Sequence, residues 1–523
     1  MLKIIDMKST LKKLKILFKR IYLPCISAVI MGLLQTCLDA PLLCFIGLVP
    51  LCISVINEHS FRVYIKKFAA FAILYNIINF SFFIRIVDLI NIPKAAGIVV
   101  SVLVILLMSV FASTVLVLVM SVFQKITKGR VHDSFSFAFL FVFGEYLMEI
   151  IPFVSFPWSR IELSCIGFMP FMQIASLFGG RFVGIIIVSI NALIAVGIKS
   201  YSYNKKAFTS FISAVLIYLI VFSFGTVKIN SDIKTDDTRN SKNISVLIAQ
   251  GSIMGVDKWE VSNYKVFSEY DEILKSVELN KIDMVVMPET ALCENINESP
   301  VTPYLKSISK RTNTLIATGS FYYDRDNDKR YNTISYIDMK SDDILSYYKQ
   351  RLVPFGEYIP FEQIIFNKQT LVSGNDNSAI NTSQGKMASV VCIESIYSSI
   401  PRKQVKDGGE IIIVSTNDSW FENTAARDQH FRHSMLRAIE NGRYVLRAAN
   451  CGISAVITPY GTVKDSITNS ESGKIISNAN LISKRTLYTM TGELFWCVSL
   501  VIILVGINKM IKQKYNYKFL NKV

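Results

Sequence analysis

The chain alternates between long apolar runs and one long stretch of mixed polarity. Seven runs precede residue 225 and one follows residue 492, at 21–38, 41–56, 68–84, 96–123, 135–151, 181–198, 207–224 and 493–510. A helix needs about 20 apolar residues to cross the hydrocarbon of a bilayer. The pattern therefore predicts a membrane domain of about seven spans over 1–225. A final span with a tail is predicted over 492–523.

Two of these runs allow a second interpretation. Run 41–56 is short and could be the second arm of a tight hairpin at Pro41. The first run has a basic lead-in like that of a signal peptide, but no small-residue cleavage site follows it and more spans come next. We therefore expect the first run to be an uncleaved span. Eight spans would place both termini on the same side of the membrane.

The stretch 226–491 has a different periodicity, in which strand-like apolar runs alternate with helical segments. We expect strands at 244–250, 283–290, 314–321, 333–338, 344–349, 387–395, 410–418 and 453–459. Helical spacing of apolar residues occurs at 258–279, and a second helix is expected at 425–446. Continuous apolar strands favour an α/β domain whose sheet is covered on both faces. The polar segment 230–243 is interpreted as a linker into this domain.

Composition and charge support this division. Apolar residues make up 51% of the 523 residues and charged residues only 18%, which is typical of a membrane protein. The net charge is +16, yet segment 226–491 holds 31 basic and 31 acidic residues. The basic excess therefore belongs to the apolar portion. A nucleic-acid partner for the neutral domain is not expected.

The excess of basic residues also predicts an orientation. The two tails and the alternate loops on their side hold 21 Lys and Arg residues, whereas the opposite side holds four, namely Arg85, Lys94, Arg160 and Arg181. Basic residues collect on the cytoplasmic side of membrane proteins. Both termini are thus expected in the cytoplasm, and 226–491 is expected to be an extracytoplasmic domain.

Three predicted strands carry a reactive side chain at or near their ends: Glu289, Lys349 and Cys392. Catalytic groups collect at strand ends in α/β sheets. A thiol can attack a carbonyl, a carboxylate can take its proton, and an ammonium can stabilise the oxyanion. Each residue alone has a plainer interpretation, an exposed strand end for Glu289 and Lys349 and a buried structural thiol for Cys392.

The short sequence motifs around these residues are more specific than the residues themselves. They are PETA (288–291), YYKQRLVPFGEYIP (347–360), VVCIES (390–395), STNDSWF (415–421) and QHFRHSMLRAIENGRYVLRAANCGISAVITPYG (429–461). These words resemble the nitrilase, or carbon–nitrogen hydrolase, superfamily, and within it the apolipoprotein N-acyltransferase family of membrane enzymes. FPWSRIEL (156–163) and PFMQIASLFGG (170–180) are similar to that family's outward loop. The resemblance implies an αββα sandwich for the outer domain.

The resemblance also implies roles for individual residues. The family's catalytic triad falls on Glu289, Lys349 and Cys392. Supporting positions fall on Glu357, Glu394 and Trp259. The chain departs from the family pattern at Ile393, where an aromatic residue is common, and at Glu422, where Gly is usual.

The function implied by the resemblance is acyl transfer through a thioester on Cys392. A phospholipid donates the acyl chain, and the α-amine of the diacylglyceryl-cysteine at the N-terminus of an apolipoprotein accepts it. This is the final step of bacterial lipoprotein maturation, which implies an inner-membrane protein with its catalytic domain on the periplasmic side. Two alternatives remain: a membrane-tethered amidase of the nitrilase type that uses water as acceptor, and a non-enzymatic multispan scaffold with a relic domain.

No cofactor or metal is expected. The sequence has no P-loop, no GxGxxG and no GxSxG. His430 and His433 are spaced as a possible metal pair, but no third ligand word lies nearby, so a structural or supporting role is favoured. Glu145 and Glu149 share one predicted span at helical spacing, and we expect them to face an aqueous crevice or the interface.

Overall fold

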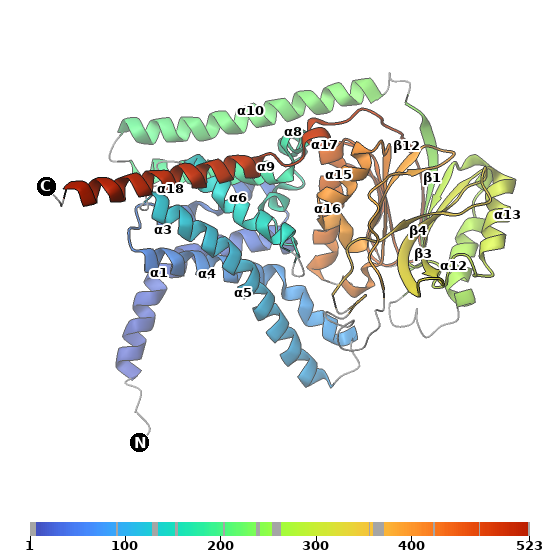
Figure 1. Cartoon of the computed structure of the whole chain (residues 1–523), viewed down its shortest axis with the longest axis horizontal. Coiled ribbons are helices and arrows are strands. Elements are labelled where there is room, and N and C mark those ends of the chain that lie inside the picture. The colour runs from blue at the N-terminus through green and yellow to red at the C-terminus, as the bar shows by residue number, and fades with distance from the viewer. Residues whose placement is uncertain are drawn as a thin grey trace. The chain divides into compact units, whose positions relative to one another are not determined.

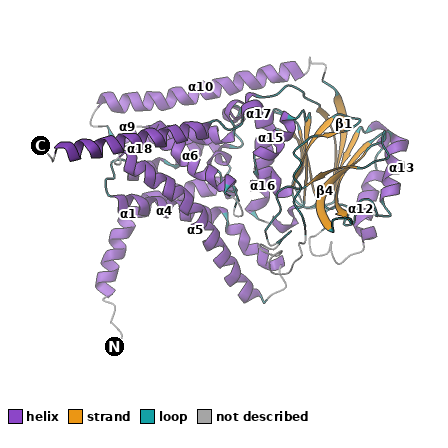
Figure 2. Ribbon diagram, viewed as in Figure 1, coloured by secondary structure: helices purple, strands orange, loops and turns teal. Residues whose placement is uncertain are grey.

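The computed structural model describes residues 7–89, 93–127, 134–151, 155–201, 204–236, 241–253, 263–354, 356–358, 371–421, 424–469 and 471–520. The chain divides into two compact units. One comprises Met1–Ile174, Phe178–Thr226 and Glu493–Val523, and the other comprises Ala175–Leu177 and Val227–Gly492. Helices build the first unit, and strands with flanking helices build the second (Figures 1 and 2).

Among its described residues, the regular secondary structure of the first unit is entirely helical. Its α-helices are α1 (Met7–Thr36), α2 (Cys44–Gly47), α3 (Val49–Val55), α4 (Phe61–Asn79), α5 (Lys94–Thr127), α6 (Ser134–Ile150), α7 (Met169–Met172), α8 (Ala175–Phe178), α9 (Gly180–Lys199), α10 (Asn204–Asp236) and α18 (Phe495–Leu520). Short 3₁₀ turns η1 (Pro41–Leu43), η2 (Ser81–Leu89) and η3 (Ile161–Cys165) connect some of them. Of these helices, residues Ala175–Leu177 of α8 and the part of α10 from Val227 onward are assigned to the second unit.

Four described helices are long and apolar enough to cross a membrane, and this confirms the expectation of membrane-spanning helices. They cover Lys94–Thr127, Gly180–Lys199, Ala207–Ser231 and Phe495–Lys512. The predicted spans 21–38 and 41–56 fall on shorter apolar helices, Arg20–Thr36 and Pro41–Val55. The total of eight spans therefore stays a prediction.

A buried cluster of charges in the first unit changes the interpretation of Glu145 and Glu149. Arg181, fully buried in α9, pairs with Oε2 of Glu149 at 3.3 Å and with Oε2 of Glu145 at 3.7 Å. Arg160 pairs with Glu162 at 2.6 Å beside them, and both side chains are fully buried. The expectation that the two glutamates face water or the interface is therefore wrong. Paired guanidinium groups satisfy them instead, which is how buried charges are usually accommodated.

The second unit contains two six-stranded mixed sheets. The first has the strand order β12-β1-β2-β3-β4-β5 and the second β11-β10-β9-β8-β7-β6. The strands of the first sheet are β1 (Asn243–Gln250), β2 (Met284–Val286), β3 (Leu315–Asp324), β4 (Lys329–Ile337), β5 (Leu345–Tyr348) and β12 (Gly473–Asn480). Those of the second are β6 (Ile380–Asn381), β7 (Lys386–Val391), β8 (Ile411–Thr416), β9 (Val445–Ala449), β10 (Ser454–Ile457) and β11 (Val463–Ile467).

The two sheets pack face to face between two layers of helices (Figure 2). One apolar core joins the sheets and includes Ile248 and Val286 of the first and Val391 and Ile413 of the second. A second core packs the outer face of the first sheet against α12 (Asn263–Lys275) and α13 (Thr302–Thr312). Helices α15 (Ser399–Lys406) and α16 (Ala425–Asn441) cover the second sheet (Figure 1). The αββα sandwich implied by the resemblance is confirmed.

Two boundaries within this unit were predicted wrongly. Segment 230–243 is not a linker throughout, because α10 continues to Asp236. The helix expected at 425–446 ends at Asn441, and Val445–Ala449 forms β9. Gly442 ends the helix because it adopts the left-handed conformation, with φ of 61°, which only glycine takes without strain.

Candidate active site

Glu289 lies just beyond the carboxyl end of β2, and both of its oxygens accept hydrogen bonds. Oε1 accepts from Nδ2 of Asn332 at 2.8 Å and from Nζ of Lys349 at 3.1 Å. Oε2 accepts from the backbone N–H of Asn417 at 3.0 Å, so the second sheet also holds this carboxylate. The carboxylate is thus buried, oriented and next to a cation.

A glycine in the neighbouring strand allows this arrangement. A Cβ atom at Gly319 in β3 would lie 2.4 Å from the carbonyl oxygen of Pro288 and 2.5 Å from Cα of Glu289. Real Cβ atoms do not come that close to backbone atoms, so only glycine lets β3 pass behind Glu289.

Lys349 directly follows β5, and its side chain is 1% exposed. Nζ lies 3.1 Å from Oε1 of Glu289 and 2.9 Å from the Glu357 carboxylate. Burial alone would lower the pKa of Lys349, but the two carboxylates outweigh burial and raise it well above its ordinary value. The lysine therefore carries a fixed positive charge in the site.

Glu357 completes the charged group. Its Oε1 accepts a hydrogen bond from Nδ2 of Asn332 at 2.8 Å, and its Oε2 accepts from the backbone N–H of Val353 at 2.8 Å. Asn332 thus donates to both Glu289 and Glu357, and Lys349 lies between the same two carboxylates. Two acids, one lysine and one amide form a single buried hydrogen-bonded group.

Cys392 lies at a sharp turn between β7 and the 3₁₀ turn η5 (Cys392–Ile396). Its φ is 49°, in the left-handed region that a side chain other than glycine rarely adopts. Thr290, directly after Glu289, also has a positive φ, of 51°. Such strained positions cluster at functional sites because the surrounding structure must hold them in place.

The Cys392 thiol is held in its neutral form. Burial raises its pKa well above the ordinary value, and the nearby Glu289 carboxylate raises it further, while Lys349 acts in the opposite direction. A neutral thiol is a weak nucleophile, so it needs a base as it attacks. Glu289 and Lys349 are the charged groups close enough to influence it most.

Glu394 fastens the Cys392 turn to the segment after Lys349. Its Oε1 accepts from the backbone N–H groups of Gln350 at 2.6 Å and Arg351 at 3.2 Å, and its Oε2 accepts from that of Val391 at 2.8 Å. The hydroxyl of Tyr347 donates to the same carboxylate. Burial raises the pKa of Glu394 to about 7 in spite of these donors. The side chain contacts backbone groups on both sides of the site and so positions the two segments.

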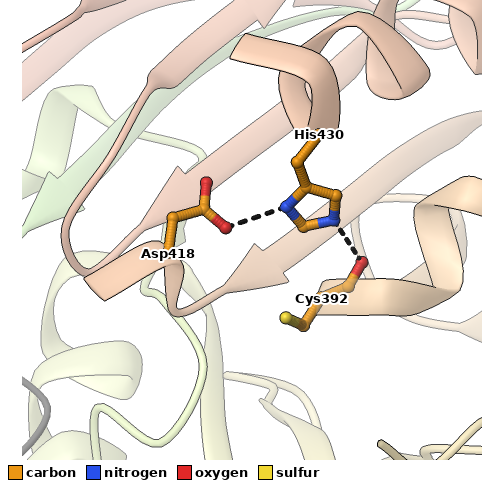
Figure 3. Close-up of side chains that lie close together, drawn as sticks. All are labelled: Cys392, Asp418 and His430. Atoms are coloured by element: carbon orange, nitrogen blue, oxygen red, sulfur yellow. Dashed lines mark hydrogen bonds and ion pairs between the residues drawn. The ribbon is translucent and has the colours of Figure 1, made fainter. Parts of the chain in front are cut away.

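A second buried network supports the Cys392 turn from behind (Figure 3). Nδ1 of His430, on α16, lies 2.9 Å from Oδ1 of Asp418, and Nε2 lies 3.0 Å from the main-chain oxygen of Cys392. Nη2 of Arg447, on β9, donates to Oδ2 of Asp418 at 2.6 Å. Burial alone would raise the pKa of Asp418, but Arg447 and His430 outweigh it and hold the pKa well below its usual range.

Cys392, Asp418 and His430 are residue types that could ligate a metal, and their ligand atoms lie within 4.8 Å of one another. Their hydrogen bonds do not fit that role. Asp418 accepts from Arg447 and Thr416, and each nitrogen of His430 contacts a polar oxygen of the protein. These contacts describe a hydrogen-bond network rather than a set of open ligands.

The structure brings four of the predicted site residues together. Glu289, Lys349 and Glu357 are joined by hydrogen bonds, and Cys392 lies within their electrostatic influence. Glu394 is adjacent and acts on the backbone. Trp259 and Glu422 lie outside the described residues. Ile393 is buried.

Sequence reasoning missed Asn332 and the Asp418–Arg447 pair. Asn332 is in β4, whose neighbour Thr333 pairs with Tyr348 of β5, and this register brings it beside Lys349. No short sequence motif marks Asn332. Asp418 lies in the quoted word STNDSWF and Arg447 in the last quoted word, but their contact depends on the long-range pairing of β8 with β9. His430 was noted only as half of a possible metal pair.

The chain matches two protein-family models. Residues 234–485 match the carbon–nitrogen hydrolase family, and residues 27–193 match the N-terminal domain of apolipoprotein N-acyltransferase. The two matches lie in different structural units.

Curated relatives match over most of the chain. The apolipoprotein N-acyltransferase of Haemophilus ducreyi is 26% identical over 399 residues, which are 73% of this chain and 76% of that protein. That of Pasteurella multocida is 28% identical and covers 62% of this chain and 65% of its own length. The Rickettsia prowazekii protein is 26% identical, covering 71% of this chain and 75% of its own length.

Solved structures are similar to part of this chain. Saccharomyces cerevisiae Nit3, of the nitrilase superfamily, has a TM-score of 0.37 and 18% identity, covering 46% of this chain and 90% of that chain. The Caenorhabditis elegans NitFhit protein has a TM-score of 0.38 and 17% identity, covering 46% of this chain and 62% of that chain.

Proposed function

This chain belongs to the apolipoprotein N-acyltransferase family within the carbon–nitrogen hydrolases, and we propose that it transfers an acyl chain from a phospholipid to the N-terminus of an apolipoprotein. The acceptor is the α-amine of a diacylglyceryl-cysteine. The observation that carries the mechanism is the buried Glu289–Lys349–Glu357 group at the strand ends, next to the strained Cys392 turn. No other described group combines a nucleophile, a base and a fixed cation in this way.

The first half-reaction forms a thioester. Sγ of Cys392 attacks the ester carbonyl carbon of the phospholipid while Glu289 takes the thiol proton. The ammonium of Lys349 stabilises the oxyanion. The carbon–oxygen ester bond then breaks, and Glu289 returns the proton to the departing glycerol oxygen. A lysophospholipid leaves, and the acyl group stays on sulfur.

The second half-reaction repeats this chemistry with an amine. The α-amine attacks the thioester carbonyl carbon, and Glu289 takes a proton from the nitrogen. The oxyanion again lies against Lys349. The carbon–sulfur bond breaks, the thiolate takes the proton back from Glu289, and an N-acyl lipoprotein leaves. Each half-reaction returns the site to its starting protonation state, so one glutamate serves both.

The charge of the site suits this sequence of steps. Lys349 stays cationic because two carboxylates surround it, so it can stabilise the oxyanion without first gaining a proton. Cys392 stays neutral until attack, because burial and Glu289 disfavour the thiolate. Base and nucleophile are thus coupled, and the thiol ionises only as it forms the new bond.

The setting proposed for the reaction is the bacterial inner membrane. Both substrates carry lipid chains, so the reaction must occur at a membrane surface. Apolar helices precede and follow the catalytic unit in sequence. The distribution of basic residues supports cytoplasmic termini and a periplasmic catalytic domain.

The proposal is tested with purified protein in mixed micelles. Phospholipid and a synthetic diacylglyceryl-cysteine lipopeptide are supplied together, and the products are measured by mass spectrometry. Equal amounts of lysophospholipid and N-acyl lipopeptide are expected. Release of ammonia from amide substrates without acyl transfer would support the amidase alternative. A protein inert toward both would support the scaffold alternative. The match of residues 27–193 to the N-terminal domain of apolipoprotein N-acyltransferase favours neither the amidase nor the scaffold alternative.

A further inference from the structure

We propose that His430 is a positioning residue for the nucleophile, which holds the main-chain carbonyl of Cys392 so that the strained turn keeps its geometry. His430 does not exchange protons with the substrate in this role. The inference rests on the proposed acyl transfer at Cys392, and it adds a residue to which neither the family matches nor the triad chemistry assigns a part.

The first argument is the direction of the contact. Nε2 of His430 lies 3.0 Å from the carbonyl oxygen of Cys392 and 2.9 Å from Oγ of Ser395, both in η5. A carbonyl oxygen has no hydrogen to donate, so Nε2 must be the donor. Figure 3 shows the carbonyl of Cys392 facing the imidazole while the sulfur points elsewhere. The ring therefore acts on the backbone of the nucleophile rather than on its thiol.

The second argument is that this backbone needs support. Cys392 has a φ of 49°, and a left-handed conformation is unfavourable for a residue with a Cβ. Such a residue keeps its conformation only when surrounding groups over-determine it. A hydrogen bond to its own carbonyl oxygen fixes the peptide plane that follows it. The Glu394 carboxylate holds the preceding residue through the Val391 N–H, so the turn is held on both sides.

The third argument is that the ring itself is held rigidly. Nδ1 lies 2.9 Å from Oδ1 of Asp418 and 3.1 Å from Nη2 of Arg447, so two charged side chains hold this edge of the ring. Asp418 is held in turn by Arg447 at 2.6 Å. The charged groups that face the ring are Asp418 and Arg447, and all three side chains are fully buried. A continuous chain of contacts thus runs from β9 to the nucleophile.

Two variants and one matched control test the inference. His430→Phe fills the space but cannot donate, whereas His430→Gln can still donate to the Cys392 carbonyl. Ser434→Ala is the control, because Oγ of Ser434 accepts from Nη1 of Arg447 at 3.0 Å in the same network, and no contact joins it to Cys392 among the described residues. Thermal unfolding of each purified full-length variant establishes that it is folded.

The first readout is the kinetics of acylation from a phospholipid in mixed micelles. His430→Phe should lower kcat on the order of 10²-fold, the loss typical of a misplaced reacting group, and leave KM for the donor nearly unchanged. His430→Gln should retain more activity than His430→Phe, and Ser434→Ala should stay near wild type. A higher KM at unchanged kcat, or equal losses in Ser434→Ala and His430→Phe, would overturn the inference.

The second readout does not depend on acyl transfer. Backbone hydrogen exchange of a peptide covering 386–397 reports how firmly the turn is held. Exchange should be faster in His430→Phe than in wild type and Ser434→Ala. Equal protection in all three would overturn the inference, even if the proposed acyl transfer were correct. A wild-type protein that forms no thioester would instead count against the proposed function, and the exchange result would still decide the role of His430.

Discussion

Nζ of Lys349 lies 3.1 Å from Oε1 of Glu289, and both side chains are buried. Glu357 contacts the same ammonium at 2.9 Å, so one cation is shared by two carboxylates. Removing either partner from a buried ion pair leaves a charge without compensation, which is strongly destabilising. The pair thus links the stability of the catalytic unit to its chemistry, and variants must be designed so that the two effects can be separated.

Lys349→Met should abolish most acyl transfer by removing the charge from the oxyanion. Loss of one oxyanion donor costs on the order of 10²–10³ in rate, and a full charge should cost at least that much. Both half-reactions pass through an oxyanion, so acylation by phospholipid and transfer to an amine should slow together. Single-turnover measurements of each step check this, with thermal unfolding as the control for folding. Acylation at a near-normal rate would mean that Lys349 is only structural.

Glu289→Gln should lower the pKa of the Cys392 thiol. The Glu289 carboxylate raises this pKa, so removing its charge shifts thiol ionisation to lower pH, while burial still keeps the pKa above the ordinary value. Lys349→Met should shift ionisation to higher pH, because the ammonium favours the thiolate. The pH dependence of Cys392 alkylation by iodoacetamide measures both shifts. The pKa of the Cys392 thiol should thus shift in opposite directions in the two variants. Identical pH profiles of alkylation would contradict the electrostatic account.

Asp418→Asn should destabilise the catalytic unit even though Asp418 does not touch the thiol in this account. It leaves Arg447 buried without its carboxylate, and breaking one side of a buried pair costs about 3–5 kcal/mol. The melting temperature should fall on the order of 10 °C for a domain of this size. A change within error would show that Arg447 finds another partner.

The same carboxylate gives a pH dependence of stability. The pKa of Asp418 is depressed in the folded state, so its stabilisation is complete above its unfolded pKa of about 3.9 and is lost as pH falls through the folded value. Acid unfolding of wild type should therefore show a loss below about pH 4 that Asp418→Asn lacks. Thermal unfolding across that range makes the comparison.

The catalytic domain should lie outside the cytoplasm. A reporter active only in the periplasm should be active when fused after Asp236, at the end of α10, and silent when fused after residue 523. The basis is the excess of basic residues in the tails and alternate loops. The reverse pattern would refute the orientation and, with it, the access of the site to lipoproteins.

The sequence predicted the strands that carry the site because they are buried on both faces. Strands β1, β7 and β8 are continuous apolar runs in the sequence. Each pairs with neighbouring strands inside its sheet and contributes side chains to the core that the two sheets share. Strands β11 and β12 were missed, since most residues of β11 and alternate residues of β12 are exposed and no apolar run marks them. Local pattern cannot identify a strand whose stabilisation comes from partners far away in sequence.

The three residues proposed as the triad lie in short, specific sequence motifs, whereas the groups that hold them do not. Asn332 is an ordinary residue in a strand, and only the β4–β5 register brings it to Lys349. Arg447 falls between the helix predicted at 425–446 and the strand predicted at 453–459, so its burial opposite Asp418 could not be anticipated. Hydrogen-bond networks depend on tertiary pairing and leave little trace in the local sequence.

The most direct test of the account is the intact mass of the purified protein after incubation with phospholipid alone. Wild type should gain the mass of one acyl chain, and hydroxylamine should remove it, as expected for a thioester. Cys293→Ala and Cys451→Ala should behave like wild type, because these thiols lie outside the Glu289–Lys349 group. Cys392→Ala should gain nothing. An acyl adduct that persists in Cys392→Ala would contradict the assignment of the nucleophile and the mechanism built on it.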